Sequence, residues 1–208
     1  MKWNEVTWYS KLAAVIFFLG VFPVLTFYIG TQYQEVKDLN AGIIENQVVA
    51  PVDYKNATYT IEGARVTLAD GSAEAPITPG SATMVRTQYF GNELKTDLNG
   101  DGREDVAFIL TQNQGGSGTF YYAVAALNMA NGYIGSDAYV LGDRIAPQSV
   151  TLSPDPSQQY VVVFNYADRA AGEPMTTQPS VGKSAYLKLD PDTMQWAIVL
   201  SPEAQQSL

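Results

Sequence analysis

The chain has 208 residues, of which 46% are hydrophobic and 16% charged, and this balance is typical of an ordered protein. It contains no cysteine and no histidine, which excludes disulfides, thiolate zinc sites, cysteine nucleophiles and triads built around imidazole. Its net charge of −9 repels phosphate backbones, so nucleic acid is not an expected partner.

The first element along the chain is an apolar segment, residues 12–30, which contains no charged side chain. At about 1.5 Å per residue, a helix of this length covers roughly the ~30 Å hydrocarbon core of a bilayer. Aromatic residues lie near both of its ends, as they do at membrane interfaces: Trp3, Trp8, Tyr9, Tyr28 and Tyr33. The sequence therefore predicts a transmembrane anchor over residues 12–30, through which the protein contacts the membrane.

Charges on the two sides of this segment predict its orientation. Lys2 and Lys11 precede it, so the positive-inside rule places residues 1–11 in the cytoplasm as a short stub and the remainder outside. Residues 31–50 are expected to form a stalk.

A cleaved secretory signal is the alternative to an anchor, but the apolar run exceeds the usual ~7–15 residues and no small-x-small cleavage pattern follows it. We expect a single-pass membrane protein with an extracytoplasmic C-terminal domain.

Residues 51–208 alternate short apolar runs with turn residues, which predicts an all-β domain, either a sandwich or a small barrel. Residues 69–81 are expected to form a loop because they are rich in Pro, Gly and Ser. The runs at 106–110 and 160–164 are continuously apolar, so they belong in central strands covered on both faces. About nine or ten strands are expected, from candidates at 57–61, 64–68, 83–90, 105–111, 120–128, 138–145, 149–153, 159–167, 184–190 and 195–201.

Between two of these strands lies the motif DLNGDGRED, residues 97–105. Oxygen-bearing side chains alternate along it, and Gly102 permits the φ > 0 bend that turns a chain around an ion. Calcium takes about six to eight oxygen ligands, and backbone carbonyls are among them. The candidate metal ligands are the side chains of Asp97, Asn99, Asp101 and Asp105 with the backbone carbonyl of Arg103.

This motif resembles the calcium loops of FG-GAP repeats, as found in integrin α-type propellers. The resemblance covers this one loop and implies that it joins two antiparallel strands and holds a structural Ca²⁺. An EF-hand is disfavoured because Phe108 occupies the position where that loop needs a bidentate glutamate. A metal-free polar turn is the alternative, since Asp, Asn and Gly are all good turn residues.

The sequence predicts no catalytic or cofactor-binding residues. Its layout resembles small bacterial membrane-anchored envelope proteins with a stalk, a compact β-domain and a single such loop, and this resemblance implies no activity. We expect an extracytoplasmic binding or structural module stabilised by calcium, with a possible protein or glycan partner in the envelope. The alternatives are a histidine-free hydrolase that cleaves envelope glycans with paired carboxylates, and an inhibitor or partner of another envelope protein. The long loop over residues 168–183 is the candidate surface for such a partner. An ordinary solvated connection with local ion pairs is the alternative that we favour for this loop.

Overall fold

The computed structural model describes residues 8–10, 12 and 52–205. The predicted stub, anchor and stalk therefore lie almost wholly outside the described residues. The chain divides into two compact units, residues 1–48 and 49–208, and the second contains the β-domain described below. Within the described ranges, no helix is both long enough and apolar enough to cross a membrane.

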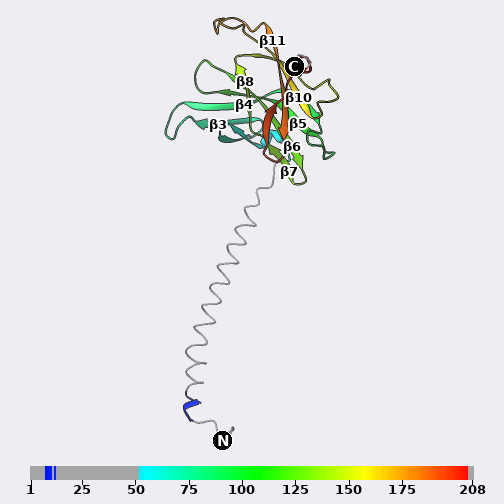
Figure 1. Cartoon of the computed structure of the whole chain (residues 1–208). Helices are drawn as coiled ribbons and strands as arrows, with labels where there is room; N and C mark the ends of the chain where they lie inside the picture. Colours follow the sequence, from blue (N-terminus) through cyan, green and yellow to red (C-terminus); the bar gives the residue numbers. More distant parts are fainter. Residues whose placement is uncertain (1–7, 11, 13–51, 206–208) are drawn as a thin grey trace. The chain divides into compact units, whose positions relative to one another are not determined.

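The described part of the second unit consists almost entirely of β-strands, which confirms the predicted all-β class (Figure 1). The elements in chain order are the 3-10 helix η2 (Tyr54–Asn56), β1 (Thr58–Ile61), β2 (Ala64–Thr67), β3 (Ser72–Pro76), β4 (Met84–Thr96), β5 (Asp105–Asn113), β6 (Phe120–Met129), β7 (Gly132–Gly135), β8 (Tyr139–Asp143), β9 (Ala146–Leu152), β10 (Val161–Asp168), β11 (Val181–Asp190), β12 (Gln195–Ile198) and the short helix α3 (Pro202–Gln205).

These strands pair antiparallel in three sheets. A six-stranded sheet has the order β3-β4-β5-β6-β7, and β8 also pairs with β6. A four-stranded sheet has the order β12-β11-β10-β9, and β1 pairs with β2 alone. The β1–β2 turn consists of Glu62 and Gly63, both with positive φ, as the predicted tight hairpin requires.

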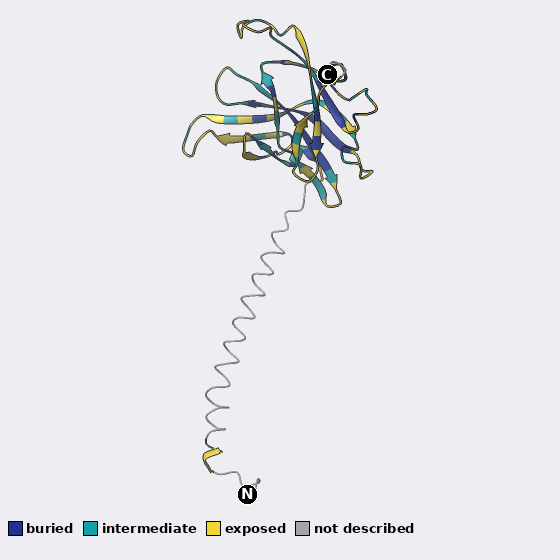
Figure 2. Ribbon diagram, viewed as in Figure 1, coloured by how far each residue is buried: buried dark blue, intermediate teal, exposed yellow. Residues whose placement is uncertain are grey.

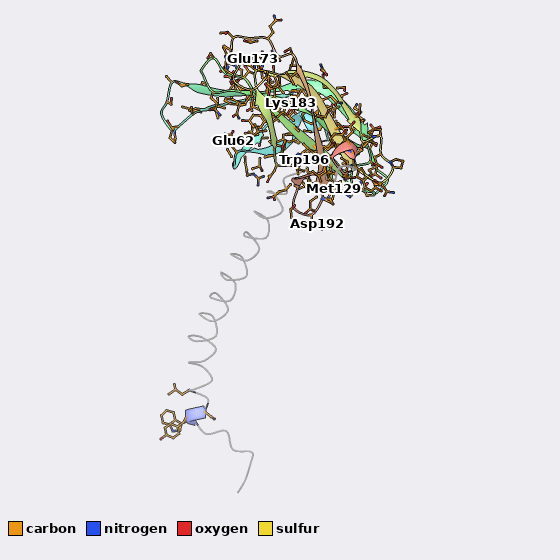
Figure 3. The ribbon with its side chains drawn as sticks, turned by 45° about the horizontal axis from the view of Figure 1, so that its top comes forward. Glu62, Met129, Glu173, Lys183, Asp192 and Trp196 are labelled. Carbon is orange, nitrogen blue, oxygen red and sulfur yellow. The ribbon has the colours of Figure 1, made fainter. Side chains whose placement is uncertain are left out.

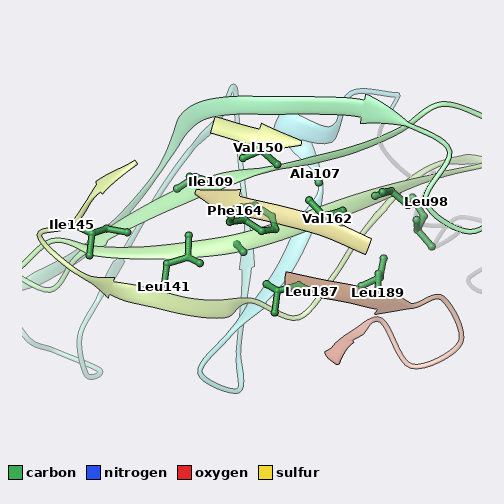
Figure 4. Packing of buried hydrophobic residues seen from close by; sticks show 13 residues of the cluster. Leu98, Ala107, Ile109, Leu141, Ile145, Val150, Val162, Phe164, Leu187 and Leu189 are labelled. Carbon is green, nitrogen blue, oxygen red and sulfur yellow. The ribbon is translucent and has the colours of Figure 1, made fainter. Parts of the chain in front are cut away.

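The central strands β5 and β6 of the six-stranded sheet are buried on both faces because each face packs against a different partner. Ala107 and Ile109 of β5 face the four-stranded sheet in a cluster that we call the inter-sheet core, together with Phe164 and Leu187 (Figure 4). The intervening residues of β5 face the opposite way, into a hairpin core that includes Phe108 and residues of η2 and β1. The continuously apolar run at 106–110 is thus central, as predicted, since alternate side chains enter two cores.

Aromatic rings fill much of the hairpin core. The ring of Phe108 lies 5.4 Å from that of Tyr54, 5.6 Å from that of Tyr59 and 5.4 Å from that of Tyr89, measured between centroids. The hydroxyls of Tyr54 and Tyr89 both donate to Oε2 of Glu93, at 2.5 Å and 2.7 Å. These bonds join η2, at the start of the β-domain, to β4 in the six-stranded sheet.

Two strands were missed by the sequence prediction. Residues 69–81 were expected to form a loop, but Ser72–Pro76 form β3, which pairs with β4 at the edge of the sheet. Nearly all of β3 is exposed, so no apolar alternation marks it. The strand β7 contains two glycines in four residues and likewise shows no strand pattern. Each forms by backbone hydrogen bonding to a longer neighbouring strand, β3 to β4 and β7 to β6.

Replacing Phe108 with alanine tests whether the hairpin core stabilises the domain. Phe108 is fully buried, so we expect Phe108→Ala to lower the free energy of unfolding by about 3–5 kcal/mol. Ile198→Ala is the matched control: Ile198 is 70% exposed, and its loss should change stability by less than about 0.5 kcal/mol. Chemical denaturation measures both, and equal effects would contradict the assignment.

Candidate metal centre

The motif predicted to bind calcium forms the loop that joins β4 to β5, two antiparallel neighbours in the six-stranded sheet. Gly100 and Gly102 have φ of +85° and +83°, a region that L side chains rarely adopt, and these two residues curl the loop. The loop contacts the end of β6 at Asn128. Met129, the next residue, lies at the opposite end of the domain from Glu173 (Figure 3).

Asp97 organises the first half of the loop through its carboxylate. Its Oδ1 accepts hydrogen bonds from the backbone N–H groups of Asn99 at 3.2 Å and Gly100 at 2.6 Å. Its Oδ2 accepts one from the N–H of Gly102 at 2.9 Å. The loop is thus wrapped around the carboxylate at its first position.

Asp101 and Asn99 organise the second half. Asp101 Oδ1 accepts from the N–H of Arg103 at 2.8 Å, and Asn99 Oδ1 accepts from the N–H of Asp101 at 3.0 Å. The amide of Asn99 donates to Asp101 Oδ2 at 3.2 Å. The two side chains are therefore in direct contact on the exposed side of the loop.

Arg103 contributes its side chain, which the sequence prediction did not anticipate. Its guanidinium lies 2.6 Å from Asp101 Oδ2, and its Nε donates to the backbone carbonyl of Asn128 at 2.5 Å. The sequence assigned a role only to its backbone carbonyl, as a candidate metal ligand. The guanidinium instead provides a positive charge beside Asp101 and connects the loop to β6.

Asp105 lies beneath the loop and is fully buried. One carboxylate oxygen accepts from the N–H of Leu98 at 2.9 Å and the other from the N–H of Asn128 at 2.8 Å. Among the described residues, none with a positive charge forms an ion pair with it. Asp105, the first residue of β5, thus connects the loop at Leu98 to the end of β6 at Asn128.

The loop shifts the pKa values of its carboxyls in opposite directions. Hydrogen bonds from backbone N–H groups, that of Gly102 first, lower the pKa of Asp97, and those of Arg103 and the neighbouring Asn99 lower the pKa of Asp101. Burial raises the pKa of Asp105; the N–H groups that it accepts from oppose this, while the charges of Asp101 and Asp97 add to it. These three carboxyls are therefore close enough to interact.

The donor set of the loop fits a hard cation such as Ca²⁺. An ionised carboxylate offers about four lone pairs and an amide oxygen two, so the hydrogen bonds above leave lone pairs unused on Asp97, Asn99, Asp101 and Asp105. In the structure, the oxygens of these side chains accept hydrogen bonds from backbone N–H groups. In the described part of the chain, no group of three or more His, Cys, Asp or Glu side chains is gathered as a metal site. Calcium at this loop stays a prediction.

Comparisons with known proteins add no family to this description: no family model, curated protein or solved structure matches the chain.

Gly102 offers a direct test of the loop backbone. A Cβ added there meets no atom within 4 Å, so the only cost of Gly102→Ala is the left-handed backbone conformation, about 1–2 kcal/mol. Gly182 in β11 is equally uncrowded and does not have that conformation, so Gly182→Ala should leave stability unchanged or slightly raise it. Equal unfolding free energies for the two variants would contradict the curled loop.

The raised pKa of Asp105 has a measurable consequence in calcium-free buffer. Because the pKa is raised, the folded state binds the proton of the Asp105 carboxyl more tightly than the unfolded chain does, and protonated Asp105 stabilises the fold. Its stabilising contribution is therefore complete below the ordinary aspartate pKa of about 3.9 and is lost as the pH rises through the higher folded pKa. Asp101→Asn removes a neighbouring negative charge, so we expect the pKa of Asp105 to fall.

NMR titration of the Asp105 carboxyl measures this effect. Asp155→Asn is the control, because Asp155 is not among the groups that shift the pKa of Asp105. An Asp105 pKa that Asp101→Asn leaves unchanged would show that the carboxyls do not interact.

Proposed function

We propose that the β-domain is a non-catalytic binding or structural module stabilised by Ca²⁺ at the loop 97–105. We further propose that residues 12–30 anchor it in the membrane with the domain on the extracytoplasmic side. The anchor rests on the uncharged apolar segment and its flanking lysines and aromatic residues.

The burial of Asp105 is the observation that carries the calcium proposal. Removing a carboxylate from water is costly unless hydrogen bonds or a positive charge compensate for it. Asp105 has two N–H donors and no described ion-pair partner, and the charges of Asp97 and Asp101 act against its ionisation. A divalent cation would compensate all three carboxylates at once.

The ligands would come from the loop itself. Asp97, Asn99, Asp101 and Asp105 would supply side-chain oxygens, and Arg103 its carbonyl. When bound, Ca²⁺ supplies positive charge and draws the oxygens of the loop together. The role is structural, since the loop positions the ends of β4, β5 and β6.

The guanidinium of Arg103 competes with the metal in this proposal. It already pairs with Asp101 Oδ2, so bound Ca²⁺ and the ion pair would share one carboxylate. Its side chain is 43% exposed, and exposed ion pairs contribute at most about 1 kcal/mol. Calcium can therefore displace it at modest cost.

The carboxylates beside the β10–β11 connection give the hydrolase alternative no support. An open pocket of about 680 Å³ beside the β10–β11 connection is lined by Asp143, Asp168 and Glu173. A glycosidase acid needs a raised pKa. The hydrogen bond from Lys183 instead lowers the pKa of Asp168, while Asp143 pairs with Arg144. Asp143 and Asp168 therefore both form ion pairs, an arrangement that suits a structural role better than proton transfer.

A calcium-dependent thermal melt of the full chain tests the proposal. At ten times its dissociation constant, Ca²⁺ should add about 1.4 kcal/mol and raise the midpoint by a few degrees relative to chelator. Millimolar concentrations are needed, since extracellular sites often bind at about 10⁻⁴–10⁻³ M. Asp101→Ala should abolish the calcium-dependent shift.

Asp155→Ala is the matched control. Asp155 Oδ1 accepts from the N–H of Ser157 at 2.9 Å, the same bond to the second following residue that Asp101 makes to Arg103. Both variants lose this side-chain to backbone hydrogen bond, but Asp155→Ala should keep the full calcium-dependent rise in melting midpoint. Arg103→Gln should strengthen calcium binding by removing the competing charge. No shift in the wild-type chain at 10 mM Ca²⁺, a concentration about tenfold above such sites, would leave the loop as a metal-free turn.

A further inference from the structure

A hollow lies on the six-stranded sheet at the start of β4, the end of that strand that is far from the candidate calcium loop. Its volume is about 420 Å³, within the usual range for small-molecule sites of roughly 300–1,000 Å³. The hollow lies over the first half of β4 and the second half of β5, and it reaches the connection to β6. It is lined by Met84, Arg86, Gln88, Thr111, Asn113, Gly115 and Thr119.

This part of the sheet is open because the four-stranded sheet covers only the other half of the same face. In β5, Ala107 and Ile109 enter the inter-sheet core, whereas Thr111 and Asn113, next in the same alternation, line the hollow. The edge strand β9 lies beside β4. Figure 2 shows β3 and the adjoining part of β4 extending from the buried centre of the domain as largely exposed strands.

The lining is polar but nearly uncharged. The side-chain amide of Gln88 and the hydroxyl of Thr119 have no partner among the described residues, so their donors and acceptors are available to a ligand. Asn113 holds the following loop in place by donating to the carbonyls of Gly116 and Gly118. The one charged residue, Arg86, pairs with Glu74 on β3.

An aromatic pair borders this polar surface. Phe90 follows Arg86 and Gln88 along β4, and its ring lies 5.4 Å from that of Tyr121 on β6, in an edge-on arrangement. Phe90 is 44% exposed although it is a large apolar side chain. Phe90 lies outside the lining of the hollow, two residues beyond Gln88 on the same strand. A ligand that extends past the hollow could therefore use both a stacking surface and hydrogen bonds.

We propose that this hollow binds a neutral oligosaccharide. Sugar hydroxyls both donate and accept, which matches the amide of Gln88 and the hydroxyl of Thr119. The hydroxyl of Thr111 already donates to the backbone carbonyl of Gln88 at 3.4 Å, so it offers a ligand its acceptor sites. The apolar face of a sugar ring stacks on an exposed aromatic ring such as that of Phe90. The paired charge of Arg86 and Glu74 favours an uncharged ligand. The inference depends on the proposed function only in taking the domain as a binding module.

A peptide fits this surface less well. Peptides that add to a β-sheet require an edge strand with free backbone groups. Here β4 pairs with both β3 and β5, and β5 pairs with both β4 and β6, so the backbone under the hollow is already used. Nucleic acid is disfavoured by the net charge of −9.

Titration of the full chain with defined tetrasaccharides tests the proposal. The probes are the β-1,4-linked tetramers of glucose and of N-acetylglucosamine, with tetragalacturonate as an acidic counterpart, and the chain is kept in a detergent without a sugar headgroup. We expect at least one neutral tetramer to bind with a Kd of about 1 mM or lower by calorimetry or ligand-observed NMR. Tetragalacturonate should bind more weakly.

Two substitutions locate the site, each with a matched control of similar type on another strand. Phe90→Ala should weaken binding by roughly three- to tenfold through lost stacking, and Gln88→Ala should also weaken it. Ile134→Ala, at 45% exposure on β7, and Gln195→Ala, exposed on β12, should leave the Kd within a factor of about two. Thermal melts should show that all four variants stay folded, with Phe90→Ala lowered by at most a few degrees because it loses the ring contact with Tyr121.

The outcomes separate this inference from the calcium proposal. Sugar binding that persists in chelator, with no calcium-dependent melt, would support the hollow and overturn the calcium site. No binding of any tetramer at a Kd of 5 mM or below, about fivefold weaker than expected, would overturn the hollow. Equal binding by Phe90→Ala, or tighter binding of tetragalacturonate, would do the same.

Discussion

The strands β5 and β6 are buried on both faces, and this double burial fixes how the other strands of the domain are placed. Each strand sends alternate side chains into two separate cores, so a shift in register of one residue would exchange the contents of both. Phe108 on one face and Ile109 on the other are both fully buried. The register of β4 against β5 is therefore strongly specified, and with it the positions of the loop and the hollow at their two ends.

The loop 97–105 combines two opposing effects. Backbone N–H groups stabilise the carboxylates of Asp97 and Asp101 where they are partly in contact with solvent, and Arg103 adds one positive charge. Asp105 lies below them without such a charge and is fully buried. The accumulated negative charge favours a cation as the ligand proposed for this loop, and the backbone hydrogen bonds hold the loop in its curled form.

Much of the fold could be predicted from local pattern. The apolar run at 106–110 indicated a central strand, and Glu62-Gly63 indicated a tight turn, because both depend on side-chain type and short-range backbone preference. The strands β3 and β7 could not be found in this way, since each pairs with the strand next to it in the chain but has no fully buried residue and shows no apolar alternation. In the loop, the acidic residues were recognisable, but the contact of Arg103 and Asp105 with Asn128 joins positions more than twenty residues apart.

The β class, the central strand of the larger sheet and the oxygen-rich loop are all readable from the amino-acid sequence, because they follow from residue type and spacing along the chain. The burial of Asp105, the pairing of Arg103 with Asp101 and the uncovered face near Gln88 become visible in the folded domain alone. The reason is physical: burial and exposure depend on which sheet covers which face. That coverage results from packing between strands that are far apart in sequence.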